Sequence, residues 1–115
     1  MVNREVIGAH YGVRDWLAQR VTAVVMAVYT LFFLTVLASL PAIDYAHWSA
    51  LWSLPVTRYA TLLFVLSVLV HAWIGVRNIF MDYVHHTGLR LVLHVLVILT
   101  LIAYGAWSVQ ILWAF

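Results

Sequence analysis

Three long uncharged stretches alternate with shorter polar segments along the chain. They are rich in Val, Leu, Ile, Ala and aromatic residues, and they cover residues 21–43, 59–76 and 91–115. Each reaches the length of roughly 18 to 20 apolar residues with which a helix crosses the hydrocarbon core of a bilayer, where backbone amides find no water. The pattern predicts a single-domain, all-α integral membrane protein over residues 1–115. We place its three transmembrane helices at about residues 17–41, 56–81 and 89–114.

A shorter helix is predicted between the first two spans, at about residues 44–54. Asp44 can cap its first turn, and Pro55 ends it because the residue before a proline avoids the helical conformation. Its large aromatic residues recur at the spacing of one helix face, at Tyr45, Trp48 and Trp52. Since Tyr and Trp concentrate at membrane interfaces, we expect this face in the headgroup layer on the outer side of the membrane.

The arginines indicate the orientation of the spans. All but one of the six basic residues precede the first span or flank the turn between the second and third: Arg4, Arg14, Arg20, Arg77 and Arg90. The positive-inside rule makes that side cytoplasmic. We expect a cytoplasmic N-terminus and a C-terminus on the outer side of the membrane. The N-terminal segment has no apolar stretch with a cleavage site, so we expect a mature segment and no signal peptide.

Composition narrows the possible chemistry. The chain is 66% hydrophobic and 9% charged, which leaves too little polar surface for a water-soluble domain. Its formal net charge of +2 is too small to predict nucleic-acid binding. Without cysteine it forms no disulfide and holds no iron–sulfur cluster. Histidine is left as the strong ligand for a soft metal.

The second span carries one polar face. At 3.6 residues per turn, its small and polar residues lie within about 40 degrees of His71; they are Ser67, Gly75, Asn78 and Asp82. The other faces are apolar, with Leu66, Val68, Val70, Trp73, Val76 and Phe80. Because an ionisable residue inside a membrane is a functional candidate by default, we expect this polar face to meet something polar or planar.

His71 is the first candidate ligand. Neutral imidazole binds haem iron strongly, burial disfavours the competing protonated form, and Gly75 leaves room for a porphyrin edge one turn away. Two alternatives stay open. The face could serve helix packing, with His71 as an interhelical hydrogen-bond partner, or His94, at nearly the same depth, could pair with His71 on one iron. The remaining histidines are expected to be structural: His10, His47, His85 and His86.

Asp82 and Tyr83 lie where the second span meets cytoplasmic water. Such residues are common at interfaces. A phenol can also donate a hydrogen bond to a carbonyl oxygen in a half-wet pocket, and a neighbouring carboxylate can pass protons. Reduction of a quinone takes two electrons and two protons, so these two residues indicate a candidate quinone site.

Three segments in this order resemble a known family: "GVRDWLAQRVTA" (12–23), "HAWIGV" (71–76) and "DYVHHTGLRL" (82–91). The chain resembles the small hydrophobic membrane anchors of bacterial succinate dehydrogenase, which is respiratory complex II. The resemblance covers nearly the whole chain. It implies an anchor, not catalytic by itself, that docks the flavoprotein and iron–sulfur subunits of the enzyme at the cytoplasmic face of the bacterial inner membrane. The C-terminus would then be periplasmic.

The resemblance also assigns roles to single residues. It implies that His71 is an axial ligand of haem b, whose other ligand comes from a second hydrophobic anchor of the same complex. Tyr83 would donate a hydrogen bond to ubiquinone, with Asp82 as its neighbour in a site completed by the second anchor and the iron–sulfur subunit. Arg20 would lie near the haem propionates.

The sequence departs from the family at one position and leaves other functions open. Arg14 stands where another member has a histidine, and His94 matches no ligand position, so neither receives a role. The nearest alternatives are an anchor of fumarate reductase or of another quinone-linked cytochrome b complex. A small transporter or channel component would predict inverted repeats or broken helices, and the sequence has neither.

Overall fold

The computed structural model describes the backbone of residues 4–114 and the side chains of residues 12–114. Its regular structure in that range is entirely helical: α1 (Arg4–Ser39), α2 (Tyr45–Ser53), α3 (Pro55–Tyr83) and α4 (Thr87–Leu112). Three of these helices are long and apolar enough to cross a membrane. The predicted all-α class with three long apolar helices is therefore confirmed.

The long helices differ from the predicted spans mainly at the start of α1. The span was predicted from about residue 17, whereas the helix already begins at Arg4. No proline interrupts the segment between these positions, so the helix continues beyond the apolar stretch. It ends at Ser39, just before Pro41, as expected for the residues that precede a proline. The limits of the spans within a membrane stay predictions.

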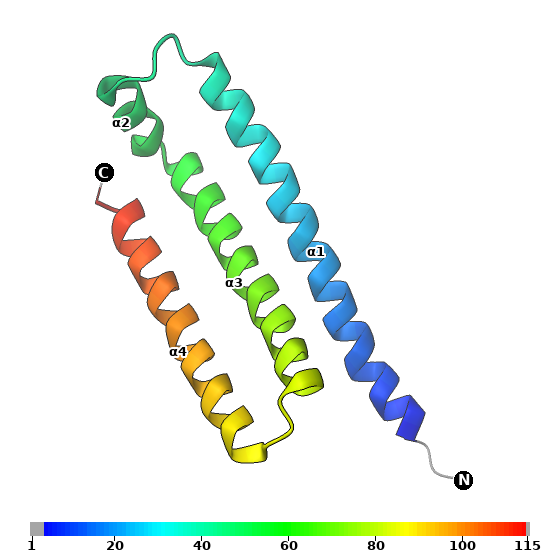
Figure 1. Ribbon diagram of the computed structural model, residues 1–115. Helices are drawn as coiled ribbons and strands as arrows, with labels where there is room; N and C mark the ends of the chain where they lie inside the picture. Colours follow the sequence, from blue (N-terminus) through cyan, green and yellow to red (C-terminus); the bar gives the residue numbers. More distant parts are fainter. Residues whose placement is uncertain (1–3, 115) are drawn as a thin grey trace.

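The three long helices lie in one layer, with α3 between α1 and α4 (Figure 1). The layer measures 65 × 27 × 21 Å along its principal axes. The start of α1 and the α3–α4 turn lie at one end, while α2 and the C-terminal end of α4 lie at the other (Figure 1). This is the arrangement that three antiparallel spans require. One flank of α3 is thus covered by α1 and the opposite flank by α4.

The short helix α2 forms where predicted. The Asp44 carboxylate accepts a hydrogen bond from the backbone N–H of His47 at 2.9 Å and contacts the Nδ1 atom of that residue at 2.7 Å. The bond from the backbone N–H and the bond from the ring hold the pKa of Asp44 below its ordinary value. The predicted cap is confirmed, and α3 starts at Pro55, its first-turn proline.

The aromatic face of α2 is only partly turned outward. Trp52 is buried, with its ring 5.9 Å from that of Phe33 on α1 and 5.5 Å from that of Trp48. Tyr45 is 78% exposed. The two tryptophans thus pack toward α1. Of the three aromatic residues, Tyr45 is the exposed one, as expected for a residue that contacts lipid headgroups.

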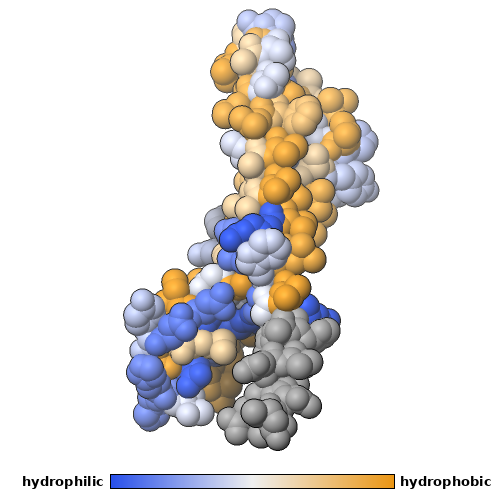
Figure 2. Space-filling view, turned by 90° about the vertical axis from the view of Figure 1, so that its right-hand side faces the viewer, coloured by the Kyte–Doolittle hydropathy of each residue, from blue (hydrophilic) through white to orange (hydrophobic). Residues whose placement is uncertain are grey.

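The outer surface is apolar along the long helices. Large side chains such as Leu31, Phe32 and Ile102 are exposed to more than 60% of their area. Figure 2 views the α1 side and shows hydrophobic residues over most of its upper half and hydrophilic residues gathered toward its lower end. A surface of this kind is stable only in an apolar solvent or against other subunits.

Candidate functional site on the polar face of α3

The polar face of α3 is turned toward α1. The Nδ1 atom of His71 lies 3.0 Å from the hydroxyl oxygen of Thr22. One helical turn away, a Cβ atom added to Gly75 would have the side-chain nitrogen of Gln19 as its neighbour at 3.8 Å. Ser67, one turn away in the other direction, is buried. Around His71 and Gly75 this face meets polar groups, as expected, and the groups belong to α1; Asp82, on the same face, is exposed.

A matching polar row runs along α1, and sequence reasoning missed it. Its members are Asp15, Gln19, Thr22 and Tyr29. They are spaced by four, three and seven residues, which places them on one helix face. That spacing could have revealed the row, although only the pairing of the two helices shows what it meets. We call this contact between the two polar rows the α1–α3 seam.

Two further polar pairs cross the α1–α3 seam. Asp15 and Arg77 form an ion pair near the end that carries the α3–α4 turn. Toward the other end, the hydroxyl groups of Tyr29 and Thr61 share a hydrogen bond of 2.6 Å. His71 and Thr22 lie between these pairs, so both ends of the seam hold α1 and α3 in register around them.

His94 lies on the other side of α3. Its ring centroid is 5.6 Å from that of Trp73 and 5.7 Å from that of Phe80, both in edge-on contact. Within the described side chains, its buried Nε2 atom has no hydrogen-bond partner. Since His71 faces α1 and His94 faces these rings, the two imidazoles do not converge on one iron. The intrachain pair of ligands that the spacing left open is absent from this structure.

Arg20, Asp82 and Tyr83 lie apart from His71. The Arg20 guanidinium is 5.3 Å from the ring centroid of Trp16. Arg20 is two residues away from Thr22, which faces α3, so Arg20 lies on the outer side of α1. Asp82 and Tyr83 close the last turn of α3, and Tyr83 is 77% exposed. At 1.5 Å per residue, Tyr83 is about 18 Å along the axis from His71. Their predicted roles stay predictions.

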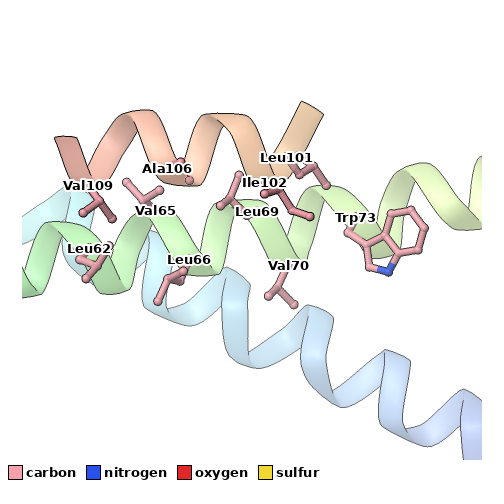
Figure 3. A pocket seen from close by; sticks show the side chains of 11 residues that line it. Leu62, Val65, Leu66, Leu69, Val70, Trp73, Leu101, Ile102, Ala106 and Val109 are labelled. Atoms are coloured by element: carbon pink, nitrogen blue, oxygen red, sulfur yellow. The ribbon is translucent and has the colours of Figure 1, made fainter. Parts of the chain in front are cut away.

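A groove on the α3–α4 side holds none of the predicted site residues. Figure 3 shows that its lining extends along both helices and consists of aliphatic side chains and the ring of Trp73. Its volume is about 480 Å³. A lining of this chemistry suits a hydrocarbon chain or an apolar helix and offers nothing to a metal ion. The groove therefore does not compete with His71 as the candidate site.

The surroundings of His71 fit a haem better than a bare metal ion. Among the described side chains, no three His, Asp or Glu residues gather as ion ligands, whereas a haem needs one imidazole from this chain. The one atom within 4 Å of a Cβ atom added at Gly75 is the side-chain nitrogen of Gln19, at the far end of that side chain. The side-chain oxygen of Gln19 is buried and lacks a hydrogen-bond partner in the described part of the chain.

Comparison with known proteins agrees with the resemblance seen in the sequence. Residues 2–107 match the family described as succinate dehydrogenase/fumarate reductase transmembrane subunit. The chain is also 41% identical over 102 residues to the succinate dehydrogenase hydrophobic membrane anchor subunit of Coxiella burnetii (strain RSA 493 / Nine Mile phase I), with 89% of each chain covered. These matches cover most of the chain and support an anchoring role. The chain belongs to the family of transmembrane anchor subunits of succinate dehydrogenase and fumarate reductase.

Proposed function

We propose that this chain anchors a succinate dehydrogenase to the membrane, binds haem b together with a second anchor subunit, and helps to form the site of ubiquinone reduction. The observation that carries the proposal is His71, an imidazole within the apolar part of α3 that faces a polar row on α1. Membership of the anchor family supports the same function.

His71 would hold the haem iron through its Nε2 atom. A bound haem supplies a one-electron carrier within the membrane. The second axial ligand would come from the other anchor subunit, because His94 faces away from His71. Arg20, whose guanidinium is exposed on the outer side of α1, is proposed to meet the haem propionates.

Tyr83 and Asp82 would form this chain's part of the quinone site. Both are exposed at the end of α3, so neighbouring subunits would have to cover them and exclude water. The Tyr83 phenol would donate a hydrogen bond to a quinone carbonyl oxygen, and Asp82 would exchange protons with water. Electrons would arrive through iron–sulfur centres of another subunit, since this chain has no cysteine.

We propose that the end with Asp82 and Tyr83 faces the cytoplasm and docks the flavoprotein and iron–sulfur subunits. The start of α1 and the α3–α4 turn lie at this same end (Figure 1), and the arginines concentrate there. A reporter fused near Thr87 should be active only in the cytoplasm, and one fused at the C-terminus only outside it. Activity of both reporters on one side would contradict this orientation.

The family match leaves fumarate reductase as the second candidate, since its description names both enzymes. The two differ in the direction of net electron flow and share this anchor chemistry. Rates of succinate oxidation by quinone and of fumarate reduction by quinol, measured on the same purified complex, distinguish them.

Tyr83→Phe tests the proposed function directly. We expect a complex purified through this chain to contain the two catalytic subunits and the second anchor. The substitution keeps the ring and removes one hydrogen bond worth roughly 0.5–3 kcal/mol, so quinone reduction should fall about 2-fold to 100-fold in kcat/KM. Succinate oxidation with a soluble artificial acceptor should stay unchanged, because that route ends before the membrane. Wild-type quinone reduction by the variant would exclude the phenol from the site.

A further inference from the structure

The hydroxyl of Thr22 makes three contacts that together decide which ring nitrogen of a neutral His71 carries the hydrogen. Its oxygen lies 2.7 Å from the backbone carbonyl oxygen of Ala18, 3.2 Å from that of Gln19 and 3.0 Å from the Nδ1 atom of His71. A hydroxyl has one hydrogen and two lone pairs. The carbonyl oxygens only accept, so the hydrogen goes to the nearer of them, at Ala18, as is usual for Thr in apolar helices.

With its hydrogen on Ala18, the Thr22 oxygen is left as an acceptor toward His71. The donor must then be the Nδ1–H group of the imidazole. A neutral imidazole carries one N–H, so the Nε2 atom keeps its lone pair. The nitrogen that binds a metal is set by the hydrogen bond that the other nitrogen makes.

We propose that Thr22 is a positioning residue that holds His71 in the Nδ1–H tautomer and aims its Nε2 lone pair at the haem iron. The inference rests on the proposed function, since it needs His71 as an axial ligand. It adds Thr22 to Arg20 as a second residue of α1 in the proposed haem site. Thr22 is 8% exposed, so water does not replace the hydroxyl as acceptor.

Thr22 would also tune the iron. An acceptor on Nδ1–H makes the imidazole more basic, and a more basic ligand stabilises the oxidised iron. Loss of the hydroxyl should therefore raise the midpoint potential of the haem and weaken its binding. Removal of such an outer partner typically costs 10-fold to 100-fold in metal affinity; a neutral hydroxyl belongs at the lower limit.

Thr22→Val is the informative variant because valine keeps the branched shape and lacks the hydroxyl. Thr22→Ser, which keeps the hydroxyl, should restore wild-type behaviour. Thr30→Val is the matched control on the same helix: the Thr30 hydroxyl donates to the carbonyl of Met26 at 2.7 Å, and the residue is exposed. It removes the same kind of bond far from His71.

The complex purified with its partner subunits is measured in three ways: redox titration of the haem, EPR of the oxidised haem, and haem loss to an excess of a haem-binding protein. Thr22→Val should raise the midpoint potential, shift the EPR signal and speed haem loss about 10-fold, while Thr22→Ser and Thr30→Val match wild type. Wild-type values for Thr22→Val would overturn this inference and leave the proposed function in place. A wild-type complex without a b-type spectrum would overturn the proposed function and this inference with it.

Discussion

On the flank of α3 that meets α1, hydrogen bonds and an ion pair cross between the helices beside the stacked rings of Tyr29 and Phe64. On the flank that meets α4, the contacts seen among the described side chains join rings and aliphatic groups. The polar pairs are Asp15 with Arg77, Thr22 with His71, and Tyr29 with Thr61. The α4 flank has the rings of Trp73 and Phe80 against His94, and that of Tyr59 against Trp113. One helix therefore presents two different kinds of surface to its neighbours.

The polar contacts on the α1 flank are not explained by the stability that they add to the packing of the helices. A hydrogen bond between membrane helices contributes about 0.6 kcal/mol on average, so three such pairs give roughly 2 kcal/mol. The α4 flank packs without them. An imidazole in the apolar region costs more to bury than a leucine, and each flank contains one, His71 in the α1–α3 seam and His94 on the α4 flank. The two differ in their partners: the Thr22 hydroxyl bonds the His71 ring, as the outer partner of a ligand histidine does, and this is the physical reason to place a ligand in the seam.

The two flanks also differ in how closely the helices approach. A Cβ atom at Gly75, on the α1 flank, would have its nearest neighbour at 3.8 Å, which is ordinary contact. A Cβ atom at Gly105 of α4 would lie 3.2 Å from the Cδ1 atom of Leu69 on α3. A Cβ atom thus fits one turn from His71, whereas at Gly105 the end of the Leu69 side chain would have to shift.

Of the two glycine variants, Gly75→Val should have the larger effect, and it should fall on the haem. In this chain an added Cβ atom would meet only the end of the Gln19 side chain, at the ordinary contact distance of 3.8 Å, so insertion of the chain into the membrane should persist. A porphyrin edge above Gly75 would be overpacked by roughly 1–3 kcal/mol, which corresponds to about 5-fold to 150-fold weaker haem binding. Haem content per purified complex measures the effect, with Gly75→Ala as the milder variant. Full haem content in Gly75→Val would move the ring away from this turn.

Gly105→Val should have a smaller effect, and on stability instead of on haem. The added methyl groups press on the end of the Leu69 side chain, which can move, so the cost is about 1 kcal/mol, at the lower limit for overpacking. The thermal midpoint of the assembled complex should fall slightly, with an unchanged haem spectrum. An altered haem spectrum in this variant would show that the two flanks are not independent.

The fold was largely predictable because few backbone structures can span a lipid bilayer. Length and hydropathy suffice to identify three helices when backbone groups have no other partner, and Asp44 and Pro55 bracket α2 by local chemistry. The start of α1 was missed because hydropathy reports the membrane crossing and not the end of the helix. Arg4 lies in a polar segment that continues the helix beyond the lipid-facing part.

Only part of the candidate site could be predicted from the sequence. His71 stands out because an ionisable residue in an apolar run is costly. Thr22 does not, since threonine is ordinary in a membrane helix and only the register of α1 against α3 brings it to the imidazole. The surroundings of Tyr83 depend on surfaces of other subunits, and no property of this chain determines them.

The most direct test of the account compares His71→Ala with His94→Ala in the purified complex, by reduced-minus-oxidised optical spectroscopy. Both variants remove one imidazole from the apolar region, one from each flank of α3. We expect His71→Ala to lose or severely alter the b-type spectrum and His94→Ala to keep it, with the catalytic subunits still attached in both. A spectrum that persists in His71→Ala and disappears in His94→Ala would place the haem on the α4 flank and contradict the account.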